Sequence, residues 1–421
     1  MNLSDVNNSF DQNMLERINP VFNTAKMTLF QLAAAGDTDA ALISERLDLT
    51  MEQTQGEVAE DELINNCIVL ETRYRTMGMM AERSGCPVKV DLPCGYTPRA
   101  IEFARKGLRF VGLDLPAAIN EAGPVISSLI EEDKRDLVKF EAVDATNYAS
   151  LKKVFDGIEG EVCITTEGLM MYFTDSEAGE CCDNIRRILC QHGGCWILAD
   201  AETVIQYILT TKAVFGDRFM EIMMKGKKRA EERSDVDVVS RTLVVNPSDP
   251  AKNIGEAMMF LARHGLKAER LIVADYAPQL KSLDKVTDEQ AQQIKEAMKQ
   301  YAFWKITPIE EMKLDAKEAK ASNFELTAEV AGDVLTLHPQ GRLDTLSSPG
   351  LLQFYEKTAS SFPIEKIRVD CSGLDYISSA GLRVLLIMSK DKEGEVTVTD
   401  INDDVREIME QTGFDNIIEI E

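Results

Sequence analysis

The chain lacks any apolar run of the ~18 residues that a membrane-spanning helix requires. Its first residues, MNLSDVNNSFDQNM, also lack the basic stretch and following apolar segment of a secretory signal. The 9 cysteines are scattered without CxxC pairs or even spacing, which favours reduced thiols over a disulfide framework. We therefore expect a cytoplasmic protein that does not associate with membranes.

Positive charge and histidine are also scarce. The 46 lysine and arginine residues are outnumbered by 71 aspartate and glutamate residues, and the formal net charge is -25. A nucleic-acid-binding protein needs a basic face to neutralise phosphates, so we expect no nucleic acid among the partners. The 3 histidines, His192, His264 and His338, lie outside the segments that predict a pocket, which argues against a histidine general base.

The chain of 421 residues exceeds the usual size of one domain, and its 44% apolar content can form more than one core. Residues 1–85 are predicted to be a helical N-terminal cap, because apolar residues such as Leu29, Leu32 and Ala33 recur at helical spacing. Residues 86–309 alternate short apolar strands with helices, the pattern of βαβ units and a parallel sheet. The strands are expected at 88–92, 109–115, 139–145, 161–168, 195–201, 238–245, 266–274 and 301–306.

A change of composition follows this α/β segment. Residues 310–323, EEMKLDAKEAKASN, are polar and charged, as expected of a linker. Residues 324–421 then contain a second, shorter set of strands and helices. We therefore predict a separate small α/β domain at this end of the chain.

The stretch VDLPCGYTPRA, residues 90–100, predicts a strand that runs into a glycine turn and then a helix. In a doubly wound sheet, ligands bind at the carboxyl ends of the strands, and Asp91, Asp114 and Asp144 each lie near such an end. Gly95 would let the backbone approach a cofactor, Asp114 would accept hydrogen bonds from ribose hydroxyls, and Asp144 would lie near an adenine ring. The alternative is that Gly95 serves packing alone.

VDLPCGYTPRA, GLDLP, VDATN and TEGLMMYF occur in the order and spacing of a known family. Residues 65–310 resemble the leucine carboxyl methyltransferases, which are class I S-adenosylmethionine-dependent methyltransferases. The resemblance implies a Rossmann-like fold, S-adenosylmethionine as the cofactor, and Glu167 among the residues that bind it. It also implies that Arg73 or Arg75 holds the methionine carboxylate through a bidentate pair.

The glycine loop departs from the pattern of this family. Pro93 replaces the first glycine and removes a backbone donor, and Thr97-Pro98 replaces Asp-Thr. The central glycine, Gly95, is retained, so cofactor binding is still expected. The alternative for either candidate arginine is a place on a solvated helix face.

The implied activity is O-methyl transfer to a carboxylate, carried by a small molecule or by a protein, with Met171 and Tyr172 in the substrate pocket. A carboxylate is already ionised at neutral pH, so alignment with the activated methyl group can suffice. No catalytic side chain is identified, and no metal ion is expected. Cys181, for example, shares helical spacing with Ile185 and Ile188, which favours a core position over a metal ligand.

The most distinctive stretch, IRVDCSGLDYISSAGLRVLLIM (367–388), predicts a buried strand, a turn and a helix. Together with GRLDT (341–345), it makes residues 324–421 resemble the STAS domain of bacterial anti-sigma factor antagonists. In that family a Ser or Thr at the start of this helix is phosphorylated by a partner kinase, and the resemblance assigns this role to Ser379. The alternative is that Ser378 or Ser379 is only an N-cap.

Two functions are compatible with these features. The first is an S-adenosylmethionine-dependent O-methyltransferase whose STAS domain regulates or recruits it. The second is a signalling protein of the anti-sigma-antagonist type, in which the first domain is an inactive cofactor sensor or a scaffold. The intact TEGLMMYF favours the first function, and Pro93 favours the second. In both, a serine kinase or an anti-sigma factor is the expected protein partner.

Overall fold

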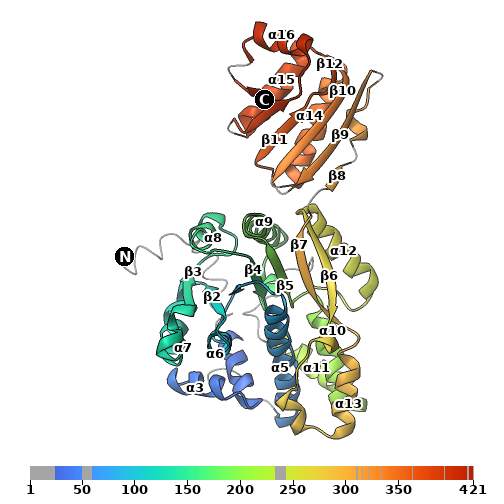
Figure 1. Ribbon diagram of the computed structural model, residues 1–421. Coiled ribbons are helices and arrows are strands. Elements are labelled where there is room, and N and C mark those ends of the chain that lie inside the picture. The colour runs from blue at the N-terminus through green and yellow to red at the C-terminus, as the bar shows by residue number, and fades with distance from the viewer. Residues whose placement is uncertain are drawn as a thin grey trace. The chain divides into compact units, whose positions relative to one another are not determined.

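The chain forms two compact units in the computed structural model, residues 1–260 with 268–307 and residues 261–267 with 308–421 (Figure 1). The structure describes residues 24–49, 59–232, 243–309, 312–314, 316–321, 323–331, 333–362, 364–392, 394–414 and 417–420. Within those residues, no helix combines the length and the apolar character needed to cross a membrane.

A seven-stranded sheet forms the centre of the first unit, in the order β3-β2-β1-β4-β5-β7-β6. Strands β1 to β5 are parallel, and β7 runs antiparallel to β5. The order reverses between β1 and β4, where a doubly wound sheet opens a crevice for ligands. The strands are β1 (Val88–Asp91), β2 (Arg109–Asp114), β3 (Val138–Ala142), β4 (Val162–Thr166), β5 (Gly194–Leu198), β6 (Leu266–Ile272) and β7 (Ala302–Pro308).

The central strands are buried along their whole length, because helices cover a parallel sheet on both faces. All four residues of β1 and all five of β4 are buried, including the charged side chains of Lys89 and Asp91 in β1. Residues 24–34 are also helical. The other helices are α3 (Thr38–Arg46), α5 (Glu60–Arg83), α6 (Arg99–Arg105), α7 (Pro116–Ser128), α8 (Tyr148–Phe155), α9 (Asp175–His192), α10 (Thr203–Phe215), α11 (Phe219–Glu232), α12 (Pro250–Arg263) and α13 (Asp288–Ala297), with short 3-10 turns η1 (Glu132–Leu137), η2 (Met170–Tyr172), η3 (Gly216–Arg218), η4 (Val273–Asp275) and η5 (Lys281–Lys285).

The helical N-terminal region and the α/β order expected from the sequence are confirmed in the part of the chain that the structure describes. Of the strand expected at 238–245, residues 238–242 lie outside the described residues, and residues 243–245 are not in a strand. Leu243 is nevertheless fully buried. Core packing, with no strand at 243–245, accounts for the burial of this residue. Helix α13 was missed, although Thr287 and Gln290 form a capping box that the sequence displays.

The second unit contains another seven-stranded sheet, in the order β14-β13-β11-β10-β9-β8, with β12 paired to β10. Strand β9 alternates buried with more exposed residues, as expected when one face of a sheet covers a core. The elements are β8 (Met312–Leu314), η6 (Lys317–Ala319), β9 (Phe324–Ala331), β10 (Val334–Leu343), α14 (Ser348–Ser361), β11 (Lys366–Asp370), β12 (Gly373–Ile377), α15 (Ser379–Asp391), β13 (Val396–Thr399), α16 (Asp403–Gln411) and β14 (Glu419–Ile420).

The segment 310–323, expected to be a linker, belongs in part to this second sheet. Strand β8 pairs antiparallel with β9, and η6 follows it. Ala316 and Ala319 are buried in the core of the second unit. A few small apolar residues are therefore enough to attach this charged segment to the core. The overall composition of the segment does not indicate this attachment.

Helix α15 packs closely against the end of β10, and only glycine fits at the point of contact. A Cβ atom at Gly381 would lie 2.8 Å from Leu343 Cγ, 2.9 Å from the Leu343 carbonyl oxygen and 2.9 Å from Ile377 Cγ1. The backbone oxygen cannot move without disturbing the sheet. Gly381 therefore sets the distance between the start of α15 and the strands beneath it.

We predict that Gly381→Ala destabilises the second unit by about 1–3 kcal/mol, the usual cost of overpacking a core. Chemical denaturation followed by circular dichroism measures the loss. Gly255→Ala in α12 is the control, because a Cβ atom there meets nothing within 4 Å. Equal stability of Gly381→Ala and the wild type would contradict the close contact.

Candidate functional site

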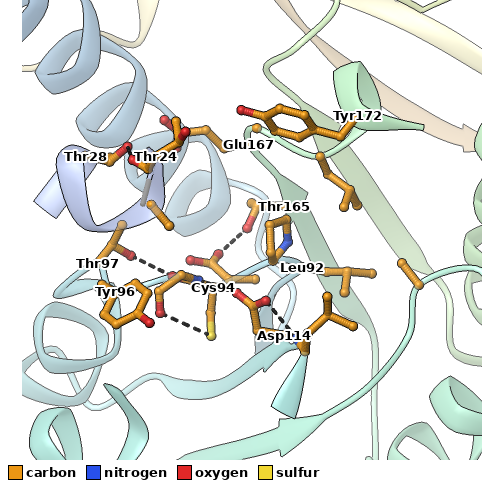
Figure 2. Close-up of a pocket in the computed structure, with 18 of the residues that line it drawn as sticks. Thr24, Thr28, Leu92, Cys94, Tyr96, Thr97, Asp114, Thr165, Glu167 and Tyr172 are labelled. Carbon is orange, nitrogen blue, oxygen red and sulfur yellow. Dashed lines mark hydrogen bonds between the residues drawn. The ribbon is translucent and has the colours of Figure 1, made fainter. Parts of the chain in front are cut away.

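A cavity of about 260 Å³ opens at the carboxyl ends of β1, β2 and β4, where the strand order reverses. Its walls come from the helix 24–34, from α5, from the loop after β1 and from the segment 167–173 (Figure 2). Figure 2 shows Thr24, Glu167 and Tyr172 at one end of the cavity and Cys94 and Asp114 at the other. The cavity therefore has a glycine-loop end and a second end formed by the helix 24–34 and the segment after β4.

Backbone hydrogen bonds hold the glycine loop in place. Leu92 N donates to Thr165 O at 2.9 Å, and Cys94 N donates to Leu113 O at 2.8 Å. Gly95 has φ +54°, a left-handed conformation that side chains with a Cβ atom rarely adopt. A Cβ atom there would lie 3.9 Å from Ala25 Cβ, so the loop faces the helix 24–34. Glycine is needed here chiefly for the backbone conformation.

Asp114, at the end of β2, lines the cavity and holds the loop from below. Its Oδ2 accepts a hydrogen bond from Gly95 N at 2.8 Å, and its Oδ1 accepts one from Leu115 N at 2.7 Å. Burial raises the pKa of Asp114 from 3.8 to about 6, although both backbone donors oppose this shift. Each carboxylate oxygen keeps a lone pair for a hydroxyl group in the cavity.

The structure distinguishes the two candidate arginines of α5. Residues two positions apart on a helix point about 200° apart, so Arg73 and Arg75 cannot share one face. Arg73 lines the cavity. Arg75 points away and forms ion pairs with Glu71 at 3.0 Å and Asp37 at 2.8 Å. We therefore assign Arg73 to the pocket and Arg75 to the packing of α5 against the start of α3.

Arg99 is a pocket residue that sequence reasoning missed, although it lies within the quoted glycine-loop stretch. Its side chain is only 3% exposed and pairs with Asp91 at 2.9 Å and Glu167 at 3.4 Å. Burial alone would lower the pKa of Arg99, but Asp91 and Glu167 raise it, so the guanidinium stays charged. Asp91 also accepts a hydrogen bond from the Thr165 hydroxyl.

The remaining sequence-predicted residues divide between the pocket and its surroundings. Glu167, Met171 and Tyr172 line the cavity. Asp144 does not, because its Oδ1 accepts from Thr146 N at 2.9 Å and from the Thr146 hydroxyl at 2.7 Å. Its neighbours Val143 and Ala145 line the wall instead.

Asp200 is a second residue that the sequence did not reveal. It is fully buried just after β5, and its carboxylate accepts from Arg73 and from the backbone of the segment after β4. A lone aspartate after an apolar strand carries no distinctive signal. Over the described residues, no cluster of three or more His, Cys, Asp or Glu side chains could hold a metal ion.

In the second unit, the structure separates the two serines at the start of α15. The side chain of Ser378 is the N-cap and accepts from Gly381 N at 3.4 Å. Ser379 is the first residue of the helix, and its side chain is exposed. The capping role therefore belongs to Ser378.

The strand order, the antiparallel β7 and the cavity at the β1–β4 reversal define the first unit as a methyltransferase-like α/β domain. Residues 325–421 match the family model of the STAS domain. The C-terminal unit is therefore a STAS domain, as the sequence predicts.

One curated relative is BtrV of Bordetella bronchiseptica, whose name describes it as an anti-sigma factor antagonist. It is 40% identical over 58 residues, which are 13% of this chain. The chain spans 50% of the length of this relative.

Solved structures resemble each unit at low identity. An anti-sigma factor antagonist from Mycobacterium paratuberculosis has a TM-score of 0.22 at 21% identity, over 24% of this chain and 87% of that one. The magnesium protoporphyrin IX methyltransferase of Synechocystis with bound SAH has a TM-score of 0.32 at 13% identity, over 54% of this chain and 84% of that one. Because both TM-scores are low, function is inferred below from the residues of the site.

We predict that S-adenosylhomocysteine binds more weakly as the pH falls below about 6. Asp114 accepts hydroxyl hydrogen bonds with both oxygens only when it is ionised, and its pKa is raised to about 6. Protonation therefore removes an acceptor that is present above this pH. Isothermal titration calorimetry from pH 5 to 8 measures the effect, and Asp114→Asn should remove the pH dependence. A wild-type affinity that is constant over this range would contradict the role of Asp114.

Proposed function

We propose that the first unit binds S-adenosylmethionine and transfers its methyl group to an acceptor, under the control of the STAS domain. The observation that carries this proposal is the link between Asp114 and Gly95 at the reversal of strand order. A carboxylate that ends β2 and a left-handed glycine after β1 form a cradle for a ribose.

The residues of the cavity suit each part of this cofactor. The lone pairs of Asp114 would accept from the ribose hydroxyls, and Gly95 would leave room for the backbone to approach the ligand. Arg73 would bind the methionine carboxylate through its free N–H groups, and Glu167 would attract the amino group. When bound, the cofactor supplies a methyl group on a positively charged sulfur. The chain then needs to align the acceptor with this methyl group and exclude water.

The charges of the cavity bear on the acceptor. Asp91, Asp114 and Glu167 line it, against the two guanidinium groups of Arg73 and Arg99. Both guanidinium groups already lie within 3.5 Å of a carboxylate. A carboxylate acceptor would bring a negative charge beside the positively charged sulfur of the cofactor, which would offset part of the cost of burying that charge. A carboxylate therefore stays the proposed acceptor, since it is already ionised and needs no general base, and an uncharged phenol is the alternative to test.

Binding and transfer test the proposal separately. We predict that the wild type binds S-adenosylhomocysteine in calorimetry and that Asp114→Ala weakens this affinity at least about tenfold, because charge-assisted hydrogen bonds contribute about 1.5–3 kcal/mol. Asp156→Ala, which removes an exposed carboxylate paired with Lys152, is the control and should bind like the wild type. Equal affinities of Asp114→Ala and the wild type would contradict the site.

Transfer is measured with labelled S-adenosylmethionine and matched phenol and benzoate acceptors. Methylation of benzoates but not phenols would support the carboxylate acceptor, and the reverse would support an uncharged acceptor. Binding without transfer to either class would favour the second function, a cofactor sensor. The observation that favours this alternative is that Pro93 lines the cavity at the position where the family has a glycine.

The STAS domain is proposed to bind a protein partner and to be regulated at Ser379. BtrV, which resembles part of this domain, is named as an anti-sigma factor antagonist. Ser379 is exposed at the start of α15, where free backbone N–H groups and the helix dipole stabilise a phosphate. Leu346, in the turn that follows β10, is 77% exposed and adds an apolar contact point. It is close in sequence to Leu343, whose carbonyl oxygen accepts a hydrogen bond from Ser378 N at the start of α15. An anti-sigma factor with serine kinase activity fits this surface.

The two serines should respond differently to substitution. We predict that Ser379→Asp weakens capture of the partner from a cell lysate, because it adds negative charge to the docking surface, whereas Ser379→Ala retains it. Ser378→Ala should instead destabilise the domain by about 1 kcal/mol through loss of the N-cap. Quantitative mass spectrometry of captured proteins and thermal denaturation measure the two effects. Identical capture by the wild type, Ser379→Asp and Ser379→Ala would eliminate the switch.

A further inference from the structure

Asp200 connects α5 to the segment after β4, beside the second end of the cavity in the first unit. It follows β5 by two residues and is fully buried. Its Oδ1 accepts from Gly168 N at 2.7 Å and from Arg73 Nη2 at 3.2 Å. Its Oδ2 accepts from Leu169 N and Met170 N, both at 2.9 Å. One carboxylate therefore holds a cationic side chain of α5 and three consecutive backbone amides.

These three amides begin the turn that carries the second end of the cavity. Gly168 has φ +72°, and this left-handed residue turns the chain so that the following N–H groups converge on the carboxylate. The turn continues into η2, where Met171 and Tyr172 line the cavity. The position of this wall is therefore fixed by the anchor at Asp200.

The same carboxylate orients Arg73. Arg73 Nη1 donates to the Thr203 hydroxyl at 3.0 Å while Nη2 donates to Asp200, so the guanidinium is held from two sides. Its Nε lies 3.5 Å from Glu167 Oε1 at the cavity. An arginine with several rotatable bonds loses much of its freedom on binding, and this arrangement removes that freedom in advance.

We infer that Asp200 is a positioning residue. It orients the guanidinium group of Arg73 toward the methionine carboxylate of the cofactor, and it holds the turn 168–172 where this turn can contact the acceptor. This inference rests on the proposed function, because it assigns Arg73 to the cofactor. A carboxylate is required, since it alone offers acceptors to all four donors. An asparagine would direct an N–H₂ group at some of them and remove the charge beside Arg73.

Glu202 provides a matched control two residues further on. It is equally buried, and its carboxylate also accepts from four donors: Arg270 Nε at 2.6 Å, Arg270 Nη2 at 2.8 Å, Trp304 Nε1 at 2.8 Å and Ala302 N at 3.0 Å. None of these donors belongs to Arg73 or to the turn after β4. Glu202→Gln therefore reproduces the loss of a buried charge without the effect on the cavity.

Two ligands separate positioning from stability. S-adenosylhomocysteine carries the methionine carboxylate, and 5′-methylthioadenosine lacks it. We expect Asp200→Asn to lower the affinity for S-adenosylhomocysteine at least about tenfold, because a charge-assisted hydrogen bond is lost. The affinity for 5′-methylthioadenosine should stay within about twofold of the wild-type value. In Glu202→Gln the ratio of the two affinities should equal that of the wild type. An equal ratio in Asp200→Asn as well would overturn the inference.

Hydrogen exchange of the full-length protein without ligand tests the turn independently of the cofactor. Peptides that cover residues 166–173 should exchange faster in Asp200→Asn than in the wild type. In Glu202→Gln these peptides should exchange at the wild-type rate. Unchanged exchange in Asp200→Asn would overturn the role of Asp200 in the turn. A wild type that binds neither ligand would instead contradict the proposed function, and with it the cofactor role of Arg73, while the exchange result still decides the turn.

Thr203→Val keeps the inference testable if Asp200→Asn does not fold. This substitution removes only the hydroxyl that accepts from Arg73 Nη1. It should lower the affinity for S-adenosylhomocysteine by about threefold, the effect of one modest hydrogen bond. The affinity for 5′-methylthioadenosine and the hydrogen exchange of residues 166–173 should both stay unchanged. Equal weakening of both ligands would show that Arg73 does not act on the methionine end.

Discussion

The pocket of the first unit depends on two buried guanidinium groups and the carboxylates that neutralise them. Arg99 connects Asp91 to Glu167, and Arg73 connects Glu167 to Asp200. Buried charges are costly unless they are paired and hydrogen-bonded, so each member of this network needs the others. The network joins β1, α5, α6 and the segments after β4 and β5 at one end of the sheet. Its geometry decides the shape of the cavity.

The charge balance of this network also restricts the chemistry of the cavity. Asp114 is the lining carboxylate that pairs with no cationic side chain among the described residues, and two backbone amides hold it. A polar, neutral hydroxyl group is therefore the natural partner for it. Arg73 and Arg99 each face a carboxylate of the chain already, and Arg73 keeps N–H groups for the carboxylate of the proposed cofactor. The excess of lining carboxylates is consistent with the proposed cofactor, whose sulfur is positively charged.

In the STAS domain, close packing of the backbone determines which residues at the start of α15 are exposed. Gly381 brings the start of α15 against the end of β10, and Ser378 caps the helix. The next residue, Ser379, then faces solvent at a helix N-terminus. A phosphate at this position would change the surface charge without disturbing the packing beneath it. The proposed cofactor pocket and the proposed docking surface thus lie in separate units.

Features that depend on the order of neighbouring residues could be predicted from the amino-acid sequence. The strand–glycine–helix pattern placed Gly95 and Asp114 at the cavity, and the start of α15 placed Ser379 at the surface. The alternation of strands and helices also predicted the two α/β units, because periodicity and turn residues are properties of neighbouring positions.

Features that join distant segments became visible in the folded chain alone. It selected Arg73 over Arg75, since the partner Asp200 lies 127 positions away along the chain. It added Arg99 to the pocket, and it made part of the expected linker a strand, because β9 offers an unpaired edge to β8. Whether a charged side chain is buried and paired depends on which segments the fold brings together. No local pattern carries that information.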